Sequence, residues 1–233
     1  MKKILIPAIL ASSLFFTGCA STEIGESKDV SQEKIYQDFH YNFEEGDKNA
    51  TFYCQFRFAG DKGTTLILSK PAQVTFDEQL LKLDSSEFSG AFYAFSKSND
   101  NLLGKHRIVY TDINNKKIEN EFTLTPINMV DVPETASKNA DLKISLDATL
   151  IQPDDYVEVH TVEADSSFSF SLDRTISTNS ITIPAAELKK QHSGKIMLVA
   201  KVRREIPLKN TTSEGGRIIF GYTSKHATIQ LKD

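Results

Sequence analysis

The sequence predicts an all-β protein made of two tandem antiparallel β-sandwich domains. Many short segments alternate apolar and polar residues with a period of two, which is the pattern of a strand with one buried face. Turn residues interrupt these segments about every ten residues. The chain has 233 residues, and about seven such segments in its first half are followed by about seven in its second. This rhythm and length favour two β-sandwiches with Greek-key connections.

The first half contains the most regular strand patterns. In residues 51–58, Tyr53, Gln55 and Arg57 take one face, and the apolar set on the other face is Phe52, Cys54, Phe56 and Phe58. Cys54 therefore falls between phenylalanines, where a thiol behaves as a small hydrophobic side chain with a raised pKa. Residues 105–112 and 117–124 flank Asn114-Asn115 and predict a β-hairpin.

The second half repeats the strand rhythm at residues 141–146, 156–162, 168–172, 180–183, 195–203, 217–222 and 227–231. Residues 196–200 are apolar on both faces, which indicates a central strand covered on both sides. Residues 185–190, which follow Pro184, predict one short helical turn. The succession of Ile181 to Pro184, this turn, Gly194 and the strand 195–203 resembles the crossing between sheets in immunoglobulin-like and fibronectin type III-like modules. The resemblance implies a fold and says nothing about activity.

The N-terminus carries a targeting signal. Two lysines, Lys2 and Lys3, precede an apolar run over residues 4–16, which is too short to span a bilayer. The run ends in Thr17-Gly18-Cys19, and this ending resembles the lipobox of bacterial lipoproteins, although Phe16 stands where leucine is most usual. The resemblance implies that Cys19 becomes the first mature residue, is thioether-linked to a diacylglycerol and is N-acylated. The alternative is an ordinary secretory signal whose cysteine stays in the mature protein.

Lipidation at Cys19 would hold the protein on a membrane without crossing it, because each buried acyl methylene contributes about 0.8 kcal/mol. Residues 20–22 lack the Asp that retains enteric lipoproteins at the inner membrane, and by this family analogy we expect the outer membrane. Loss of residues 1–18 would remove two lysines and no acid, so the net charge of -4 would become -6. An acidic chain without Trp is a poor nucleic-acid binder.

These signals predict five regions along the chain. A signal peptide covers residues 1–18 and a polar, flexible tether covers 19–35, with an ordered segment as the alternative for the tether. The first sandwich is expected at 36–127 and the second at 140–233. Between them, residues 128–139 have little apolar pattern and read as a linker.

No motif in the sequence indicates catalysis, a metal site or a cofactor. The five histidines lack the zinc-protease spacing, and there is no Gly-x-Ser-x-Gly. His192-Ser193 is a pair of neighbours on a polar loop rather than a nucleophile aimed at by a base. Calcium binding stays open at three clusters of acids and amides, at residues 99–101, 112–115 and 154–155.

A basic set remains, made of Lys201, Arg203, Arg204 and Arg217. It is either a docking patch for an anionic partner or a solvated edge whose charges discourage strand pairing. The leading functional hypothesis is a non-enzymatic envelope lipoprotein whose partners are the membrane, through Cys19, and an envelope protein or polymer. A surface-displayed ligand-binding or adhesive module and an enzyme with a site built from distant loops are the alternatives. The oligomeric state is not predicted.

Overall fold

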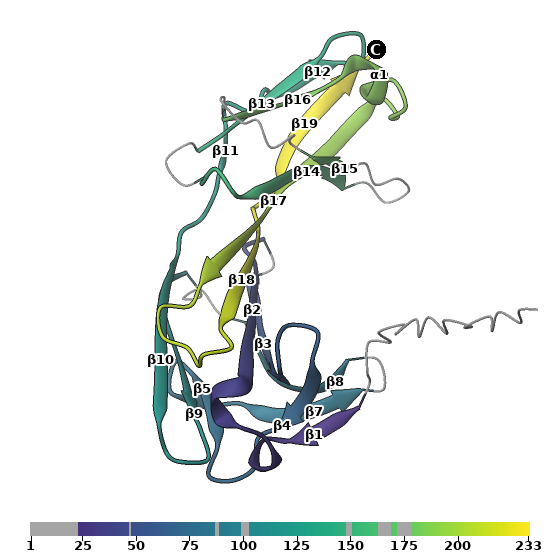
Figure 1. The fold of residues 1–233 in the computed structure, drawn as a ribbon. Coiled ribbons are helices and arrows are strands. Elements are labelled where there is room, and N and C mark those ends of the chain that lie inside the picture. The colour runs from purple at the N-terminus through teal and green to yellow at the C-terminus, as the bar shows by residue number, and fades with distance from the viewer. Residues whose placement is uncertain are drawn as a thin grey trace, which may run out of the picture.

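The described strands of the protein form three sheets arranged as two packed bodies, one above the other (Figure 1). The computed structural model describes residues 23–46, 48–86, 89–98, 103–147, 151–162, 169–171 and 179–233. Within these residues almost all regular structure is β, as predicted, and the one α-helix is α1 (Ala185–Leu188) in the predicted helical turn.

The first sandwich packs part of a 12-stranded sheet against a separate 4-stranded sheet. Its share of the large sheet consists of β1 (Ile24–Glu26), β2 (Ile35–Glu44), β3 (Asn49–Phe58), β4 (Thr64–Ile67), β7 (Lys82–Ser86) and β8 (Gly90–Ser98). The facing sheet consists of β5 (Gln73–Phe76), β6 (Gln79–Leu80), β9 (Gly104–Thr111) and β10 (Lys117–Leu124). The predicted hairpin is confirmed, because β9 pairs antiparallel with β10 from Thr111 opposite Lys117 onward.

Aromatic side chains from the two facing sheets form the core of this sandwich. The rings of Phe52 and Phe76 stack with centroids 4.4 Å apart, and those of Phe56 and Tyr110 are 4.6 Å apart. Phe52, Cys54 and Phe56 have no exposed surface, which confirms three members of the predicted buried face of β3, whereas Phe58 at the end of the strand is 37% exposed. Burial raises the pKa of the Cys54 thiol, as expected from its position.

The second sandwich uses the other end of the 12-stranded sheet. Its strands there are β12 (Thr135–Ser137), β14 (Tyr156–Val162), β15 (Ser169–Ser171), β17 (Gly194–Pro207), β18 (Gly216–Thr223) and β19 (Ala227–Lys232). A 3-stranded sheet faces them, made of β11 (Met129–Val130), β13 (Leu142–Leu146) and β16 (Ser180–Ile183). The first part of β17 lies between β14 and β19, so the prediction of a central strand at 196–200 is confirmed.

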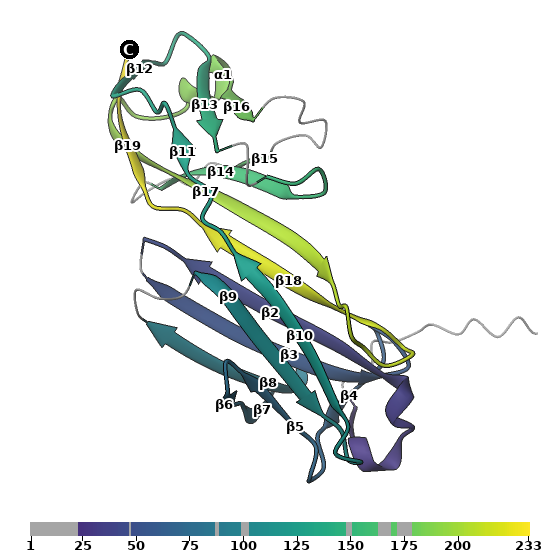
Figure 2. The ribbon, with the colours of Figure 1, turned by 90° about the vertical axis from the view of Figure 1, so that its left-hand side faces the viewer.

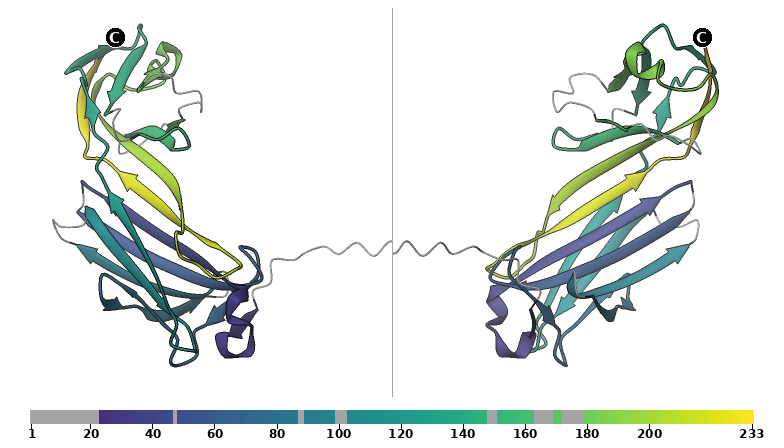
Figure 3. Two further views of the ribbon diagram at one scale, coloured as in Figure 1. Left: turned by 60° about the vertical axis from the view of Figure 1, so that its left-hand side comes forward. Right: turned by 90° about the vertical axis from the view of Figure 1, so that its right-hand side faces the viewer.

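One hairpin joins a sheet of the first sandwich to a sheet of the second, so that the two form one continuous sheet. The second part of β17 pairs with β18, and β18 runs parallel to β2 from Gly216 opposite Gln37 to Thr223 opposite Glu44 (Figures 2 and 3). Alternate residues of β18 are buried in the core, and the Tyr222 ring lies 6.1 Å from that of Phe43. The strand at 217–222, which the sequence assigns to the second domain, therefore completes the sheet of the first.

The loop of this hairpin is bound on both sides of the first sandwich. On β10, the buried side chain of Asn120 accepts hydrogen bonds from the backbone N–H groups of Lys209 and Asn210, both at 3.0 Å, and donates to the Asn210 carbonyl at 2.7 Å. At the start of β2, Thr212 donates to the Ile35 carbonyl at 2.7 Å. Because β2 and β10 belong to opposite sheets, the loop links the two sheets of one sandwich.

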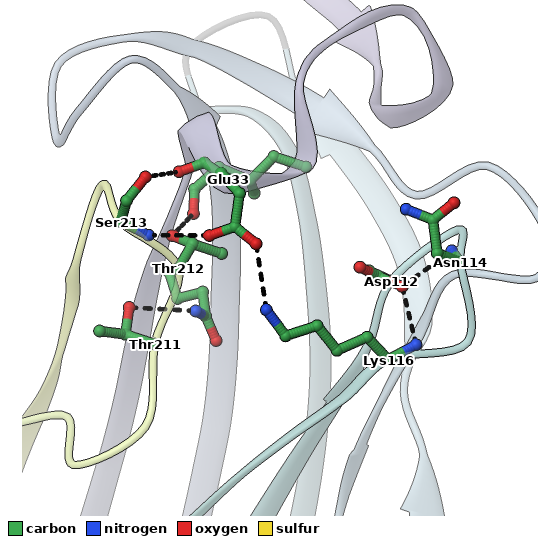
Figure 4. Close-up of polar contacts among 9 residues, drawn as sticks. Glu33, Asp112, Asn114, Lys116, Thr211, Thr212 and Ser213 are labelled. Carbon is green, nitrogen blue, oxygen red and sulfur yellow. Dashed lines mark hydrogen bonds and ion pairs between the residues drawn. The ribbon is translucent and has the colours of Figure 1, made fainter.

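The N-terminal segment completes this binding site for the loop (Figure 4). Ser213 donates its hydroxyl to the Glu33 carbonyl at 2.8 Å, and its N–H to the Glu33 carboxylate at 3.3 Å. The same carboxylate accepts from Lys116 Nζ at 3.0 Å. Asp112 shapes the turn that presents Lys116 by accepting from the backbone N–H of that residue at 2.9 Å.

The structure corrects the prediction of a flexible tether over residues 19–35. From residue 23 the chain is ordered: β1 pairs parallel with β4, and two 3-10 turns follow at Ser27–Asp29 and Gln32–Lys34. Ser27 is fully buried, and its hydroxyl accepts the Ser69 N–H at 2.8 Å. The sequence did not indicate this order, because the segment is polar and is held by backbone pairing and hydroxyl contacts rather than by buried apolar side chains. Residues 19–22 of the predicted tether lie outside the described residues.

The predicted linker at 128–139 is also partly regular. It contains β11, which pairs with β13, and β12, which pairs parallel with β19. Such strands of two or three residues carry no detectable alternation, so their sequence resembles a loop.

Replacing Gly216 with alanine is expected to weaken the attachment of the hairpin to β2. A Cβ there would collide with the backbone carbonyl of Gln37 and come within 2.5 Å of Leu208 Cδ1. Because a backbone atom cannot rotate away, we expect the free energy of unfolding to fall by about 1–3 kcal/mol, measured from the urea midpoint. Gly46→Ala is the control, since a Cβ there comes no closer than 3.8 Å to His226. Equal midpoints for the two variants would contradict the prediction.

Candidate groove on the shared sheet

The four residues of the predicted basic patch have three different environments. Lys201 and Arg203 are exposed on one face of β17, as their spacing predicts. Arg204 has the opposite parity, and its side chain is only 12% exposed. Arg217 lies on β18, where it pairs with Asp38 of β2. The structure therefore does not present the four as one patch.

Arg204 is a structural residue. Its Nε and Nη2 donate to the two carboxylate oxygens of Asp155 at 2.7 and 2.6 Å, and the Asp155 side chain has no exposed surface. This bidentate pair ties β17 to the residue that precedes β14. This geometry counts against the predicted docking role of Arg204, because its guanidinium is bound to Asp155 and turned inward.

Arg217 is also largely neutralised. Its Nε donates to Asp38 Oδ1 at 3.0 Å, and His40 Nε2 lies 3.1 Å from the same oxygen, while the His40 ring stacks on Tyr53 at 4.4 Å. Burial acts to raise the pKa of Asp38, but His40 and Arg217 outweigh burial, and the pKa is lowered. The carboxylate is thus ionised at neutral pH and cancels the charge of Arg217.

Lys201 and Arg203 line a groove of about 400 Å³ on the outer face of the shared sheet. The groove lies where the two sandwiches meet, because its walls come from β2 of the first and from β14, β17 and β18 of the second. The groove is lined mainly by the side chains of His40, Asn42, Glu44, Tyr156, Glu158, Lys201, Arg203, Ile219 and Thr223. Gly221 also lies in its floor.

Strand register arranges this lining in rows across four strands. One row consists of Asn42, Gly221, Arg203 and Tyr156, and the next of Glu44, Thr223, Lys201 and Glu158. Neighbouring strands lie about 4.8 Å apart, and rows two residues apart on one strand lie about 6.7 Å apart. Gly221 has no side chain to fill its place in the first row, and a Cβ there would collide with Asn42 Oδ1. The Asn42 amide therefore lies over Gly221.

The second row is largely balanced in charge. Glu158 accepts hydrogen bonds from the Tyr156 hydroxyl and from His160 Nε2, the latter at 2.8 Å, and Lys201 is its cross-strand neighbour. Burial acts to raise the pKa of Glu158, but these three partners lower it overall. In the first row, by contrast, neither Arg203 nor the Asn42 amide has a hydrogen-bond or ion-pair partner among the described residues. A guanidinium without a partner can bind an anion.

The other sequence candidates do not form a site within the described part of the chain. Asp112 accepts the N–H groups of Asn114 and Lys116 in a turn, and no group of three or more His, Cys, Asp or Glu residues there could hold a metal ion. Ser193 donates to Asp233 at 2.6 Å rather than to a histidine. Cys19 and residues 99–101 lie outside the described residues. No described helix is long and apolar enough to cross a membrane.

The sequence predicted two of the groove residues, Lys201 and Arg203, and did not indicate the others. The alternation of β2 could have placed Asn42 with His40 and Glu44 on an outer face, but nothing local indicates that β2 lies beside β18. Gly221 and Tyr156 become part of the site only through that pairing and through the pairing of β17 with β14.

Comparisons with known proteins do not assign the chain to a family. No family model matches, and no curated protein matches. Among solved structures, the chain is similar to DIP-gamma IG1+IG2, with 10% identity over 85% of this chain and 95% of that one and a TM-score of 0.22. It is also similar to murine CEACAM1b (7% identity, 84% of this chain, all of that one, TM-score 0.25) and to the Yersinia pseudotuberculosis adhesin InvE (12%, 84%, 61%, 0.22). TM-scores this low establish neither a shared fold nor a shared activity.

Arg203 and Arg204 are adjacent on β17, so substitutions at the two positions can be compared for their effect on the free energy of unfolding. Arg204→Gln leaves the buried Asp155 carboxylate without its counter-ion, and we expect a loss of about 3–5 kcal/mol in the free energy of unfolding. Arg203→Gln removes an exposed side chain and is expected to change it by no more than about 0.5 kcal/mol. Chemical denaturation of both variants measures the difference. Equal losses would contradict the assignment of a structural role to Arg204 alone.

Proposed function

We propose that this protein is a non-enzymatic lipoprotein of the bacterial cell envelope that docks another envelope component in the groove of its shared sheet. The observation that carries the docking role is the composition of the groove, whose walls come from both sandwiches and include the unpartnered Arg203. The N-terminal pattern ending in Thr17-Gly18-Cys19 supports the anchor. The described groove lining offers recognition groups rather than a nucleophile aimed at by a base.

The ordered segment that begins at residue 23 is consistent with a membrane-anchored role. The predicted lipid on Cys19 would be only four residues from Glu23, where the described chain begins, and β1 starts at Ile24. Four residues of extended chain reach at most about 14 Å. The first sandwich would therefore sit near the outer-membrane surface rather than far from it on a long tether.

Lipidation can be tested on the full-length chain in a bacterial host. Wild-type protein is expected to incorporate labelled palmitate and to sediment with outer membranes, whereas Cys19→Ser should lose both properties because it lacks the thiol that the diacylglycerol modifies. Cys54→Ala is the matched control, since Cys54 is buried in the first sandwich and should not affect labelling. Equal labelling of Cys19→Ser and wild type would overturn the anchor.

Docking can be tested by placing a photo-crosslinking amino acid at Tyr156, which lies in the groove and is 40% exposed. Irradiation of intact envelopes is expected to yield one dominant crosslinked species, identified by mass spectrometry. The same amino acid at Leu80, which is 57% exposed and lies on β6 outside the groove, serves as the control. Absence of any Tyr156-specific product would overturn docking in the groove. Protease treatment of intact cells then distinguishes a periplasmic protein from a surface-displayed adhesive one.

A further inference from the structure

We infer that the groove recognises a carboxylate side chain on an extended acidic segment of a partner protein, with Arg203 as the primary contact. This inference rests on the proposed docking function and specifies its chemistry.

Arg203 is suited to a planar anion. The guanidinium presents two parallel N–H groups that match the two oxygens of a carboxylate, and such bidentate pairs are among the stronger hydrogen-bonded interactions. The nearest acid on the same face of β17 is Glu205, whose side chain is 63% exposed and lies 3.9 Å from Arg217. Arg203 itself has no ion pair with any described residue, so its donors can serve a ligand.

The first row of the groove places a second polar group, the Asn42 amide, on the side of Gly221 that faces the ligand. Gly221 separates Arg203 from Asn42, and the Cα atoms of those two residues are two strand spacings apart, about 9.6 Å. Gly221 has no side chain of its own, and the Asn42 amide lies over it, with Oδ1 2.3 Å from the position that a Cβ would take. A carboxylate that accepts from Arg203 can therefore lie next to the Asn42 amide, and this amide can bind the adjacent peptide group of the ligand. Tyr156, 40% exposed, closes the far end of the row with an aromatic ring.

Charge in the second row favours a monoanion over a phosphate. Glu158 is ionised, since its pKa is lowered, and Glu44 is exposed at the other end of the row. Lys201 lies between them and offsets one of the two, so the row keeps one net negative charge, which at the row spacing of about 6.7 Å does not attract a second negative charge on the ligand. One arginine with one carboxylate is balanced, whereas a dianion would face the net negative charge of the second row. The groove therefore discriminates against inorganic phosphate and phosphate monoesters, which carry close to two negative charges at neutral pH.

The dimensions suit a peptide. Three strand spacings from β2 to β14 make a row about 14 Å long, and an extended chain covers this length with about four residues. A single buried acidic side chain at Arg203 would then fix the register of the segment.

The test uses full-length protein, labelled with nitrogen-15 and purified with its lipid in detergent micelles. Two blocked peptides are titrated by NMR: Ac-Ser-Ser-Glu-Ser-Ser-amide and its counterpart with Gln in place of Glu. We expect the Glu peptide to shift the backbone amides of Asn42, Arg203 and Gly221 and to bind at least tenfold more tightly than the Gln peptide. Arg203→Gln should lose this preference, and Arg203→Lys should recover only part of it because an ammonium cannot bind bidentately.

Lys195→Gln is the matched control, because Lys195 is exposed on the same strand but outside the groove. Its affinity should equal that of wild type. Equal binding of the Glu and Gln peptides, or full affinity in Arg203→Gln, would overturn the inference. So would tighter binding of inorganic phosphate or of vesicles containing phosphatidylglycerol. A Tyr156 crosslink without peptide preference would overturn the ligand class while leaving docking intact; loss of both would overturn the proposed function as well.

Discussion

The parallel pairing of β18 with β2 is the constraint on which the rest of the structure depends. It places a strand from the last part of the chain beside one of the first strands, over the full length of β18. Through this pairing the two sandwiches share one sheet, the core of the first gains Tyr222, and the outer face of β17 comes within reach of β2. A linker alone would leave the angle between modules free. Here the ladder of backbone hydrogen bonds fixes it.

Neighbouring residues of β17 have different roles, and the groove depends on this difference. Because successive side chains of a strand point to opposite faces, Arg203 and Arg204 cannot serve the same purpose. Arg204 turns inward and ties the strand to Asp155, and this fixes the outward direction of Arg203. The same rule places Lys201 beside Glu158 and lets the Asn42 amide lie over Gly221. Recognition chemistry on this face is thus a consequence of packing on the other.

Local patterns in the sequence were sufficient for the fold class, most strands, the β9–β10 hairpin, the buried Cys54 and the outward pair Lys201 and Arg203. They failed where structure depends on contacts distant in the sequence. β1 and β12 are too short for alternation and owe their form to parallel partners. The inward turn of Arg204 depends on Asp155, 49 residues earlier, and the groove depends on a pairing between strands some 180 residues apart. Hydrophobic periodicity reports which face is buried but not which strand lies alongside.

Because β18 lies near the end of the chain, the first sandwich cannot complete its sheet until most of the chain has been made. Domains usually fold as units from the N-terminus while the chain is still being made. The first sandwich cannot do so completely, because β2 would expose its unpaired edge until residues 216–223 are available. Contacts of such sequence separation slow folding, since a long loop must close before they form. During that interval the open edge of β2 is available for mispairing with another chain.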